Sequence, residues 1–254
     1  MSSDNRHARP LCRATVVDAA IEVLESQGYE ALTMRRLADH LDVVPMALYR
    51  HVSDKVDLEG AVVDRAMTRV SLPVPDADWR DAMTSLNGDI RRNLLMLPGL
   101  IAPLLARPNL GINAMTIREL SIGILRRAGF NGHDAERDTA LLLVYTIGFV
   151  ALEMPRRATG YHADGSSDPE LEQQFSKLPA AMFPNTVELR TRPGEFVSDA
   201  QFDFGLTRIL DGMETSLGRG ARTSRSHEEQ AGYAPDRAET RSTGRAAHQS
   251  DSAG

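Results

Sequence analysis

Apolar residues recur at spacings of three and four along most of the chain, the pattern of helices that bury one face. In "ATVVDAAIEVLESQG", Val17, Ile21 and Leu24 follow this spacing, and Gly28 stands where such a helix would end. The pattern repeats in "DKVDLEGAVVDRAMTRV", "DWRDAMTSLNGDIRRNLLML", "GINAMTIRELSIGILRRAG" and "HDAERDTALLLVYTIGFVALEM". No run alternates convincingly as a β-strand does, and we predict an all-α fold.

Interruptions of this pattern suggest how the chain is organised. Two prolines in "SLPVPD" mark a boundary, and residues 155–169 are a polar loop rich in glycine, serine and proline. From Arg219 onward there is no Val, Ile, Leu, Met, Phe or Trp, so this segment cannot bury enough apolar surface to offset its ordering entropy. The predicted parts are a flexible arm (1–11), an N-terminal domain (12–72), a larger C-terminal domain (73–217) and a disordered tail (218–254).

The first of these domains contains a helix-turn-helix pattern. "TMRRLADHL" predicts a helix that ends at Leu41, "DVV" a tight turn, and Pro45 the first position of a second, very short helix. Ala38 is small enough to let the two helices approach. The apolar residues that can form their shared core are Leu37, Leu41, Val43 and Leu48.

With Leu48 inward, the short helix presents a mixed polar, cationic and aromatic face. Such a face suits the major groove of DNA, where arginine reads guanine and apolar groups meet thymine methyls. In "SDKVD", Ser53 or Asp54 can cap the next helix, and Lys55 lies in its first turn, where a DNA phosphate would be held. Further positive charge near the motif comes from Arg6, Arg9, Arg13, Arg35 and Arg36. The net charge of −6 is therefore compatible with a local DNA-binding face. A solvated face of a bundle would explain the short helix alone, but not its combination with the turn and the capped helix.

The run "AAIEVLESQGYEALTMRRLADHLDVVPMALYRHVSDKVDLEGAV" resembles the DNA-binding domain of TetR-family transcriptional regulators. The resemblance implies DNA contacts from Arg35, Pro45, Met46, Ala47, Tyr49, Arg50, His51 and Lys55. Two positions depart from the family pattern. Asp42 stands where glycine is usual, although aspartate tolerates a left-handed conformation. Val44 stands where many members have a capping serine, which weakens the helix start by about 1 kcal/mol.

The C-terminal domain is similar, more loosely, to that of tetracycline repressors, through "DWRDAM", "ARP", "GFVALE" and "FDFGL". The helix around "ALLLVYTIGFVAL" is apolar on every side and should be covered on every side. The final helix has an apolar seam formed by Phe202, Leu206, Ile209, Met213 and Leu217. The resemblance implies that these two helices form a four-helix homodimer interface; the alternative is the core of a monomer. A dimer would place two recognition helices about one DNA turn, or a multiple of it, apart, on a palindromic operator.

The remaining helices are expected to enclose an effector pocket. Its candidate lining residues are Met67, Met83, Leu86, Ile90, Leu94, Leu97, Met115, Tyr145 and Phe149. Most of them would serve equally as plain core residues. The resemblance implies magnesium-tetracycline ligands at positions that here are Pro103 and the vicinity of Tyr145, and only Glu153 is similar to its counterpart. We therefore expect a largely apolar effector, with no metal and no cofactor.

The other functional classes have little support. The chain has no G-x-S-x-G, no phosphate loop, no H-E-x-x-H and only one cysteine, Cys12, so we expect no enzymatic activity. No signal peptide is visible, and the longest apolar run, about thirteen residues, is shorter than the roughly 20 that span a bilayer. The expected protein is a cytoplasmic, ligand-responsive repressor. The alternative is a helix-turn-helix activator or DNA-binding protein without a small-molecule effector.

Overall fold

The computed structural model describes residues 10–97, 99–107, 111–188 and 193–231. The regular secondary structure of this part is helical, apart from one isolated bridge between Tyr161 and Ser167, and the part contains no strand. The all-α prediction is confirmed. The chain divides into two compact units, Met1–Glu214 and Thr215–Gly254. Of the functional residues predicted above within the described ranges, all but Leu217 lie in the first unit.

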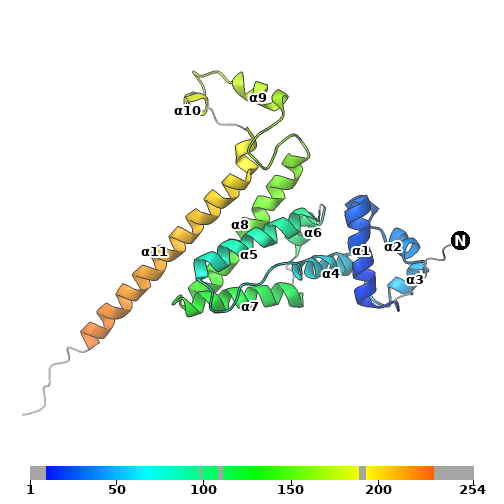
Figure 1. Cartoon of the computed structure of the whole chain (residues 1–254), viewed down its shortest axis with the longest axis horizontal. Coiled ribbons are helices and arrows are strands. Elements are labelled where there is room, and N and C mark those ends of the chain that lie inside the picture. The colour runs from blue at the N-terminus through cyan, green and yellow to red at the C-terminus, as the bar shows by residue number, and fades with distance from the viewer. Residues whose placement is uncertain (1–9, 98, 108–110, 189–192, 232–254) are drawn as a thin grey trace, which may run out of the picture. The chain divides into compact units, whose positions relative to one another are not determined.

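Short helices with well-defined ends form the N-terminal part (Figure 1). They are α1 (Arg13–Gln27), η1 (Tyr29–Ala31), α2 (Met34–His40), α3 (Pro45–Leu48) and α4 (Lys55–Met67). Gly28 ends α1 with a φ of 80°, a conformation that favours glycine. The Thr33 side chain caps α2 by accepting from the Arg36 amide at 3.2 Å, and Asp54 caps α4 by accepting from the Asp57 amide at 2.7 Å.

The C-terminal part is built on the longer helices α5 (Trp79–Leu95), α7 (Ile112–Arg127), α8 (Gly132–Arg157) and α11 (Asp199–Ala231). Between them lie the short elements α6 (Ile101–Ala106), α9 (Pro169–Ser176), α10 (Pro184–Glu188) and η2 (Pro193–Val197). Helices α5, α7 and α8 pack on one another, and Figure 1 shows them side by side. The short elements α6, α9, α10 and η2 were not predicted, because five to eight residues carry too little periodicity to identify a helix.

Helix α4 belongs to both groups of helices. It packs against α1 on one side and against α5, α6 and α7 on the other. Its predicted apolar stripe is buried along its whole length, from Leu58 through Val62, Val63 and Met67 to Val70 just beyond the helix. The two parts of the protein thus share one continuous core through this helix.

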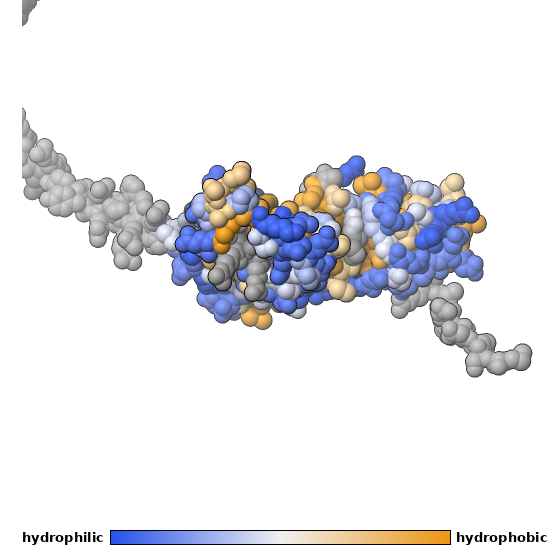
Figure 2. All heavy atoms as spheres, turned by 90° about the horizontal axis from the view of Figure 1, so that it is seen from above, coloured by the Kyte–Doolittle hydropathy of each residue, from blue (hydrophilic) through white to orange (hydrophobic). Residues whose placement is uncertain are grey.

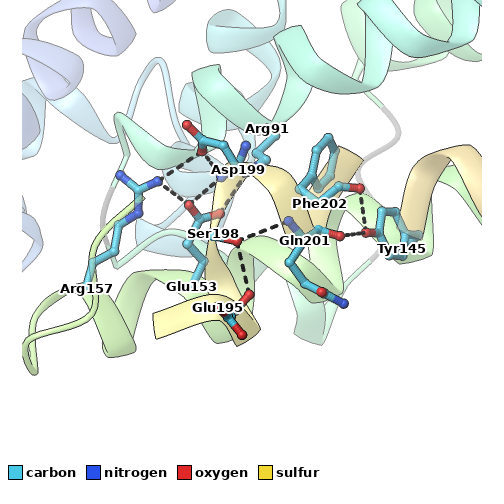
Figure 3. A network of polar contacts seen from close by, with 9 residues as sticks. All are labelled: Arg91, Tyr145, Glu153, Arg157, Glu195, Ser198, Asp199, Gln201 and Phe202. Carbon is cyan, nitrogen blue, oxygen red and sulfur yellow. Dashed lines mark hydrogen bonds and ion pairs between the residues drawn. The ribbon is translucent and has the colours of Figure 1, made fainter. Parts of the chain in front are cut away.

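A buried ion network joins α5, α8 and the start of α11 (Figure 3). The Arg91 guanidinium donates to both carboxylate oxygens of Glu153, at 2.8 and 2.6 Å, and to Asp199 at 2.6 Å. Arg157 also pairs with Glu153. Burial lowers the pKa of Arg91, but the hydrogen bonds to Glu153 and Asp199 together with their negative charges raise it by more. Because Glu153 is completely buried, this pairing is what makes its charge tolerable in the core.

The apolar seam of α11 faces its own chain. Phe202, Leu206 and Met213 are only 1%, 2% and 3% exposed with no second chain present. The Phe202 ring stacks on Tyr145 of α8, with centroids 5.4 Å apart. These three residues have almost no surface left for a partner, so their assignment to a dimer interface needs correction; the alternative of a core within one chain describes them better. Ile209 and Leu217 are half-buried.

Helix α8 is not covered on every side within one chain. Leu141, Val144 and Leu152 are exposed, Val144 by 68%, and their spacing places them on one face. On the face of the molecule drawn in Figure 2, apolar patches lie among mainly hydrophilic side chains. With 26 residues and a mean hydropathy of 1.4 over its most apolar stretch, α8 is long and apolar enough to cross a membrane. The uninterrupted apolar run within it, considered in the sequence above, is too short to do so. The same composition is also that of a helix covered by a second protein chain.

Two boundaries also differ from prediction. Helix α8 includes Pro155 and ends at Arg157, and α9 starts at Pro169, which leaves a shorter loop than expected. Helix α11 continues to Ala231, although residues 218–231 were expected to be disordered. This stretch contains arginine, alanine, glutamate and glutamine, which favour a helix once it has been started by the buried turns before it. Residues 232–254 lie outside the described part.

Replacing Arg91 by methionine should destabilise the fold, because Glu153 would keep only its contact with Arg157. We expect Arg91→Met to lower the free energy of unfolding by about 3 kcal/mol in urea titrations. The double variant Arg91→Met/Glu153→Leu should recover more than half of that loss, since it leaves no buried charge. Arg80→Met, which breaks the exposed pairs with Asp211 and Glu214, is the control and should have a much smaller effect. Equal losses for Arg91→Met and Arg80→Met would contradict this account.

Candidate nucleic-acid interface and effector cavity

The turn between α2 and α3 has the conformation expected from its sequence. Asp42 has a φ of 54° and is the one non-glycine residue with a positive φ among those described. The amide of Val43 donates to the carbonyl of Ala38 at 3.0 Å and closes the turn. The expectation that aspartate adopts the left-handed conformation here is confirmed.

Helix α3 is held by its surroundings more than by its own bonds. Val44 precedes it without a side-chain cap, as predicted, and Pro45 occupies its first position. Leu48 is completely buried beside Leu37 and Ala38 of α2, which are equally buried, whereas Leu41 and Val43 are half-buried. A helix of four residues is unstable alone, so this burial is what fixes its direction.

The side chains proposed to contact DNA lie around one exposed helix. Pro45, Met46, Tyr49 and Arg50 are exposed, Met46 by 71%, while Ala47 and His51 are half-buried. Arg35, near the start of α2, is also exposed. Neither Arg35 nor Arg50 has an ion-pair partner within the described residues. The protein thus presents an apolar, aromatic and cationic surface here, and the individual DNA contacts remain predictions.

Arg13 has a different role from the one expected. Its guanidinium donates to both oxygens of Asp57 in α4, at 2.9 and 2.5 Å, and to the backbone carbonyl of His51 at 2.8 Å. The amide of Ser53 donates to the same carboxylate at 2.9 Å. Arg13 therefore clamps the end of the short helix to α1 and α4, and its charge is already paired with a carboxylate. Pairing across 44 residues has no periodic signature in the sequence.

Lys55 is also held within the chain. Its ammonium lies 3.6 Å from Glu59 and 4.6 Å from the centre of the Tyr29 ring. The Tyr29 hydroxyl donates to Glu59 at 2.8 Å, and burial together with this bond raises the pKa of Tyr29 to about 12. A phosphate would have to compete with Glu59 for Lys55, so this contact remains a prediction. Arg6 and Arg9 lie outside the described residues.

A cavity of about 390 Å³ lies between α4, α5, α6, α7 and α8. Six of the nine predicted lining residues surround it, namely Met67, Met83, Leu86, Ile90, Leu94 and Met115. The other three do not. Tyr145 and Phe149 belong to the aromatic cluster with Phe202, and Leu97 is buried outside the cavity wall. Their assignment came from apolar spacing alone, which cannot tell a cavity wall from a packed core.

The cavity also has polar groups that apolar periodicity did not find. The Asn87 amide donates to the Met83 carbonyl at 2.8 Å and accepts from the Thr146 hydroxyl at 2.9 Å. Ser121 and Thr139 line the wall as buried hydroxyls, and each donates to a carbonyl of its own helix. Arg107 and Arg118 stand on the wall as well, the latter paired with Glu136. A ligand would therefore meet a mainly apolar wall with a few hydrogen-bonding points.

The position related to a magnesium-tetracycline ligand is already occupied by an ion pair. Glu153 is bound to Arg91 and Arg157 and is completely buried. Pro103 offers no side-chain donor, and Tyr145 donates to the carbonyl of Phe202 at 2.8 Å. Within the described ranges, no three His, Cys, Asp or Glu side chains are grouped so that they could hold a metal ion. The side chains present do not fit a metal-bound drug of that type.

Comparison with known proteins agrees with this geometry. A family model described as bacterial regulatory proteins, tetR family, matches residues 16–62, and one described as the tetracyclin repressor-like C-terminal domain matches residues 72–217. An HTH-type transcriptional regulator of Saccharopolyspora erythraea is 31% identical over 214 residues, 82% of this chain and 86% of the relative. The class C tetracycline repressor of Escherichia coli is 30% identical over 208 residues, 80% and 91% of the two chains. The crystal structure of Streptomyces coelicolor ActR in complex with actinorhodin has a TM-score of 0.73 and 28% identity, covering 83% of this chain and 100% of that one.

The Arg13–Asp57 clamp should make stability depend on acid pH. The hydrogen bond from Arg13 is the main cause that lowers the pKa of Asp57 from 3.8 to about 2. Because the folded pKa is depressed, the contribution is complete above pH 3.8 and is lost as the pH falls toward about 2. We expect Asp57→Asn to cost about 1–2 kcal/mol at pH 7, allowing for partial solvent screening, and less below pH 4.

Urea unfolding of the wild type and of Asp57→Asn between pH 7 and pH 3 measures this difference. Asp39→Asn is the control, since Asp39 is exposed and has no ion pair in the described chain. A gap between wild type and Asp57→Asn that stays constant down to pH 3 would refute the clamp's contribution.

Proposed function

The chain belongs to the TetR family, and we propose that it is a repressor that binds a palindromic operator as a homodimer and is released by a small effector. As a member of this family it is a DNA-binding transcriptional regulator and not an enzyme. The observation that carries the proposal is α4, which is joined to the end of the recognition helix α3 through the Arg13–Asp57 pair and lines the cavity with Val63 and Met67. We place its action in the cytoplasm.

The DNA-binding domain, residues 12–72, would insert α3 into the major groove. The exposed side chains of Met46, Tyr49 and Arg50 face away from Leu48 and supply apolar, hydroxyl and guanidinium groups for base edges and phosphates. Arg35, Pro45, Ala47, His51 and Lys55 complete the proposed contact surface. The clamp from Arg13 supports this role because it fixes the end of α3 before DNA arrives.

The effector would occupy the cavity in the C-terminal domain, residues 73–217. Apolar walls with buried hydroxyls favour a largely apolar molecule that carries a few hydrogen-bonding groups. ActR, which is similar over most of the chain, binds actinorhodin, and that molecule is the first compound to test. The engaged Glu153 argues for an effector that binds without a metal.

A second copy of the chain would cover the apolar face of α8. Leu141, Val144 and Leu152 are exposed on one side of this helix, and a soluble protein rarely leaves such a face uncovered. We therefore move the proposed dimer contact from the buried seam of α11 to this face. Two-fold pairing would set the two α3 helices at the fixed separation that a palindromic operator requires.

Release would follow from a difference in affinity between two states. The effector would bind best when α4 has swung and changed the separation of the two recognition helices. It can weaken operator binding only by the ratio of its affinities for the two states. The alternative function is an activator or DNA-binding protein without an effector, and the polar groups in the cavity wall favour the ligand-responsive form.

Operator binding is tested by fluorescence anisotropy with the DNA upstream of the protein's own gene, at two salt concentrations. We expect tight, salt-sensitive binding that excess random duplex does not abolish, and release by actinorhodin or a related compound. Arg50→Ala should weaken binding at least about tenfold. Arg126→Ala, an exposed arginine in the last turn of α7, should leave it unchanged. If random DNA displaces this duplex as effectively as the duplex itself does, operator recognition at that site is ruled out.

The dimer contact is tested by placing a charge on α8. Val144→Asp should convert the dimer to a monomer in light scattering after size exclusion, because a carboxylate would be buried without a partner. Operator affinity should fall at least about a hundredfold with it. Ile112→Asp is the matched control, an equally exposed branched residue on α7. A Val144→Asp protein that remains dimeric would place the interface elsewhere.

A further inference from the structure

Helix α7 begins without a cap from its own segment. Its first flanking residue, Gly111, has no side chain. One oxygen of Asp64, in α4, accepts from the amides of Asn113 and Ala114, both at 3.0 Å, and the other accepts from the Asn113 side chain at 3.0 Å. A carboxylate from another helix thus satisfies the donors of the first turn and complements the helix dipole.

The contact between Asp64 and the start of α7 is also tight. A Cβ atom on Gly111 would lie 2.1 Å from Cγ and 2.2 Å from Oδ1 of Asp64, so only glycine fits. Since hydrogen bonds are lost beyond about 3.5 Å, a shift of about 1 Å between the two helices would break this cap. The start of α7 and the middle of α4 are therefore expected to move together.

Both sides of this contact lie on the proposed effector cavity. The cavity wall includes Ala114 and Met115 from the capped turn of α7. From α4 it includes Val63, next to Asp64, and Met67 one turn later. A molecule in the cavity would touch each helix within a turn of the carboxylate that joins them.

Helix α4 is in turn fastened to the DNA-binding helices by charged pairs. Arg65 pairs with Asp18 of α1 at 2.9 Å, and Arg69, just after α4, pairs with Glu25 at 2.8 Å. At the other end of α4, the Asp57–Arg13 pair extends to the backbone of His51. A displacement of α4 would reach the end of the recognition helix through these pairs.

We propose that Asp64 is a positioning residue. Through it, a displacement of the start of α7 at the cavity moves α4, and α4 in turn moves α3. This inference rests on the proposed function, because it requires both a DNA site and a ligand cavity. The competing route is direct contact of a ligand with Val63 and Met67, which would not need Asp64. Removal of the Asp64 carboxylate distinguishes the two routes. Direct contact would still couple the cavity to the DNA site, whereas the proposed link would be lost.

The test uses the full-length protein and the operator duplex found by anisotropy, with amide hydrogen exchange as the readout. Coupling between two sites is reciprocal, so DNA bound at α3 must alter the start of α7 if the link exists. In the wild type, we expect the operator to change exchange across residues 112–118 by at least about threefold. In Asp64→Ala, free and DNA-bound rates there should agree, with operator affinity within about threefold of wild type. Asp64→Asn, which keeps an acceptor oxygen, should restore part of the change.

The matched control is Asp78→Ala. Asp78 caps α5, which also lines the cavity, by accepting from the amides of Arg80 and Asp81 at 2.9 and 3.1 Å, but it comes from the same segment as the helix it caps. This variant should keep the wild-type response, which separates loss of a cap from loss of the link. An undiminished response in Asp64→Ala, or no response in a wild type that binds its operator, would overturn the link alone. A wild type that binds no operator would overturn the proposed function and the link with it.

Discussion

Burial of α4 against two groups of helices is the constraint on which the rest of the protein depends. Its apolar stripe fills the core between α1 and the helices α5, α6 and α7, so both groups pack against the same helix. The charged residues of the same helix contact one group or the other. Asp57 and Arg65 bind the DNA-binding helices, whereas Asp64 binds α7. A helix that is shared in this way can transmit a displacement, because packed interiors shift between discrete arrangements and do not deform continuously.

A shared helix transmits motion only if something else stays fixed, and the ion network of Arg91 supplies that reference. It ties α5, α8 and the start of α11 through one buried guanidinium, and rings of Phe149 and Phe202 lie 5.4 and 4.7 Å from it. Ion pairs of this kind add little net stability but penalise any arrangement that separates the charges. The network therefore keeps α8 in one position and presents its uncovered apolar face in a constant geometry. In the proposed dimer, α7 and α4 would move against this fixed frame.

The sequence predicted the parts of this design that are local. The left-handed Asp42, the uncapped Val44 and the buried stripe of α4 all follow from neighbouring residues and were found. The parts that were missed depend on pairs distant in sequence, such as Arg13 with Asp57 or Asp64 with Ala114. Apolar spacing in the sequence also could not distinguish a dimer interface, a cavity wall and a packed core, because all three require apolar residues. Phe202 was predicted in a dimer interface and Phe149 in a pocket with Met83; the two phenylalanines lie in one aromatic cluster, whereas Met83 lines the cavity.

The pairing of charges near α3 bears on how a chain with a net charge of −6 would recognise DNA. Arg13 and Lys55 are engaged by Asp57 and Glu59, so much of the local positive charge holds the domain together. Fewer cations are left for phosphates, so we expect counterion release to supply a smaller share of the affinity than it would if these two side chains were unpaired. In the proposed complex, the free energy that selects a site would come largely from base contacts of the exposed helix α3, which the Arg13–Asp57 pair holds in place. A regulator built in this way gains discrimination between sequences from the same acidic residues that reduce its overall affinity for DNA.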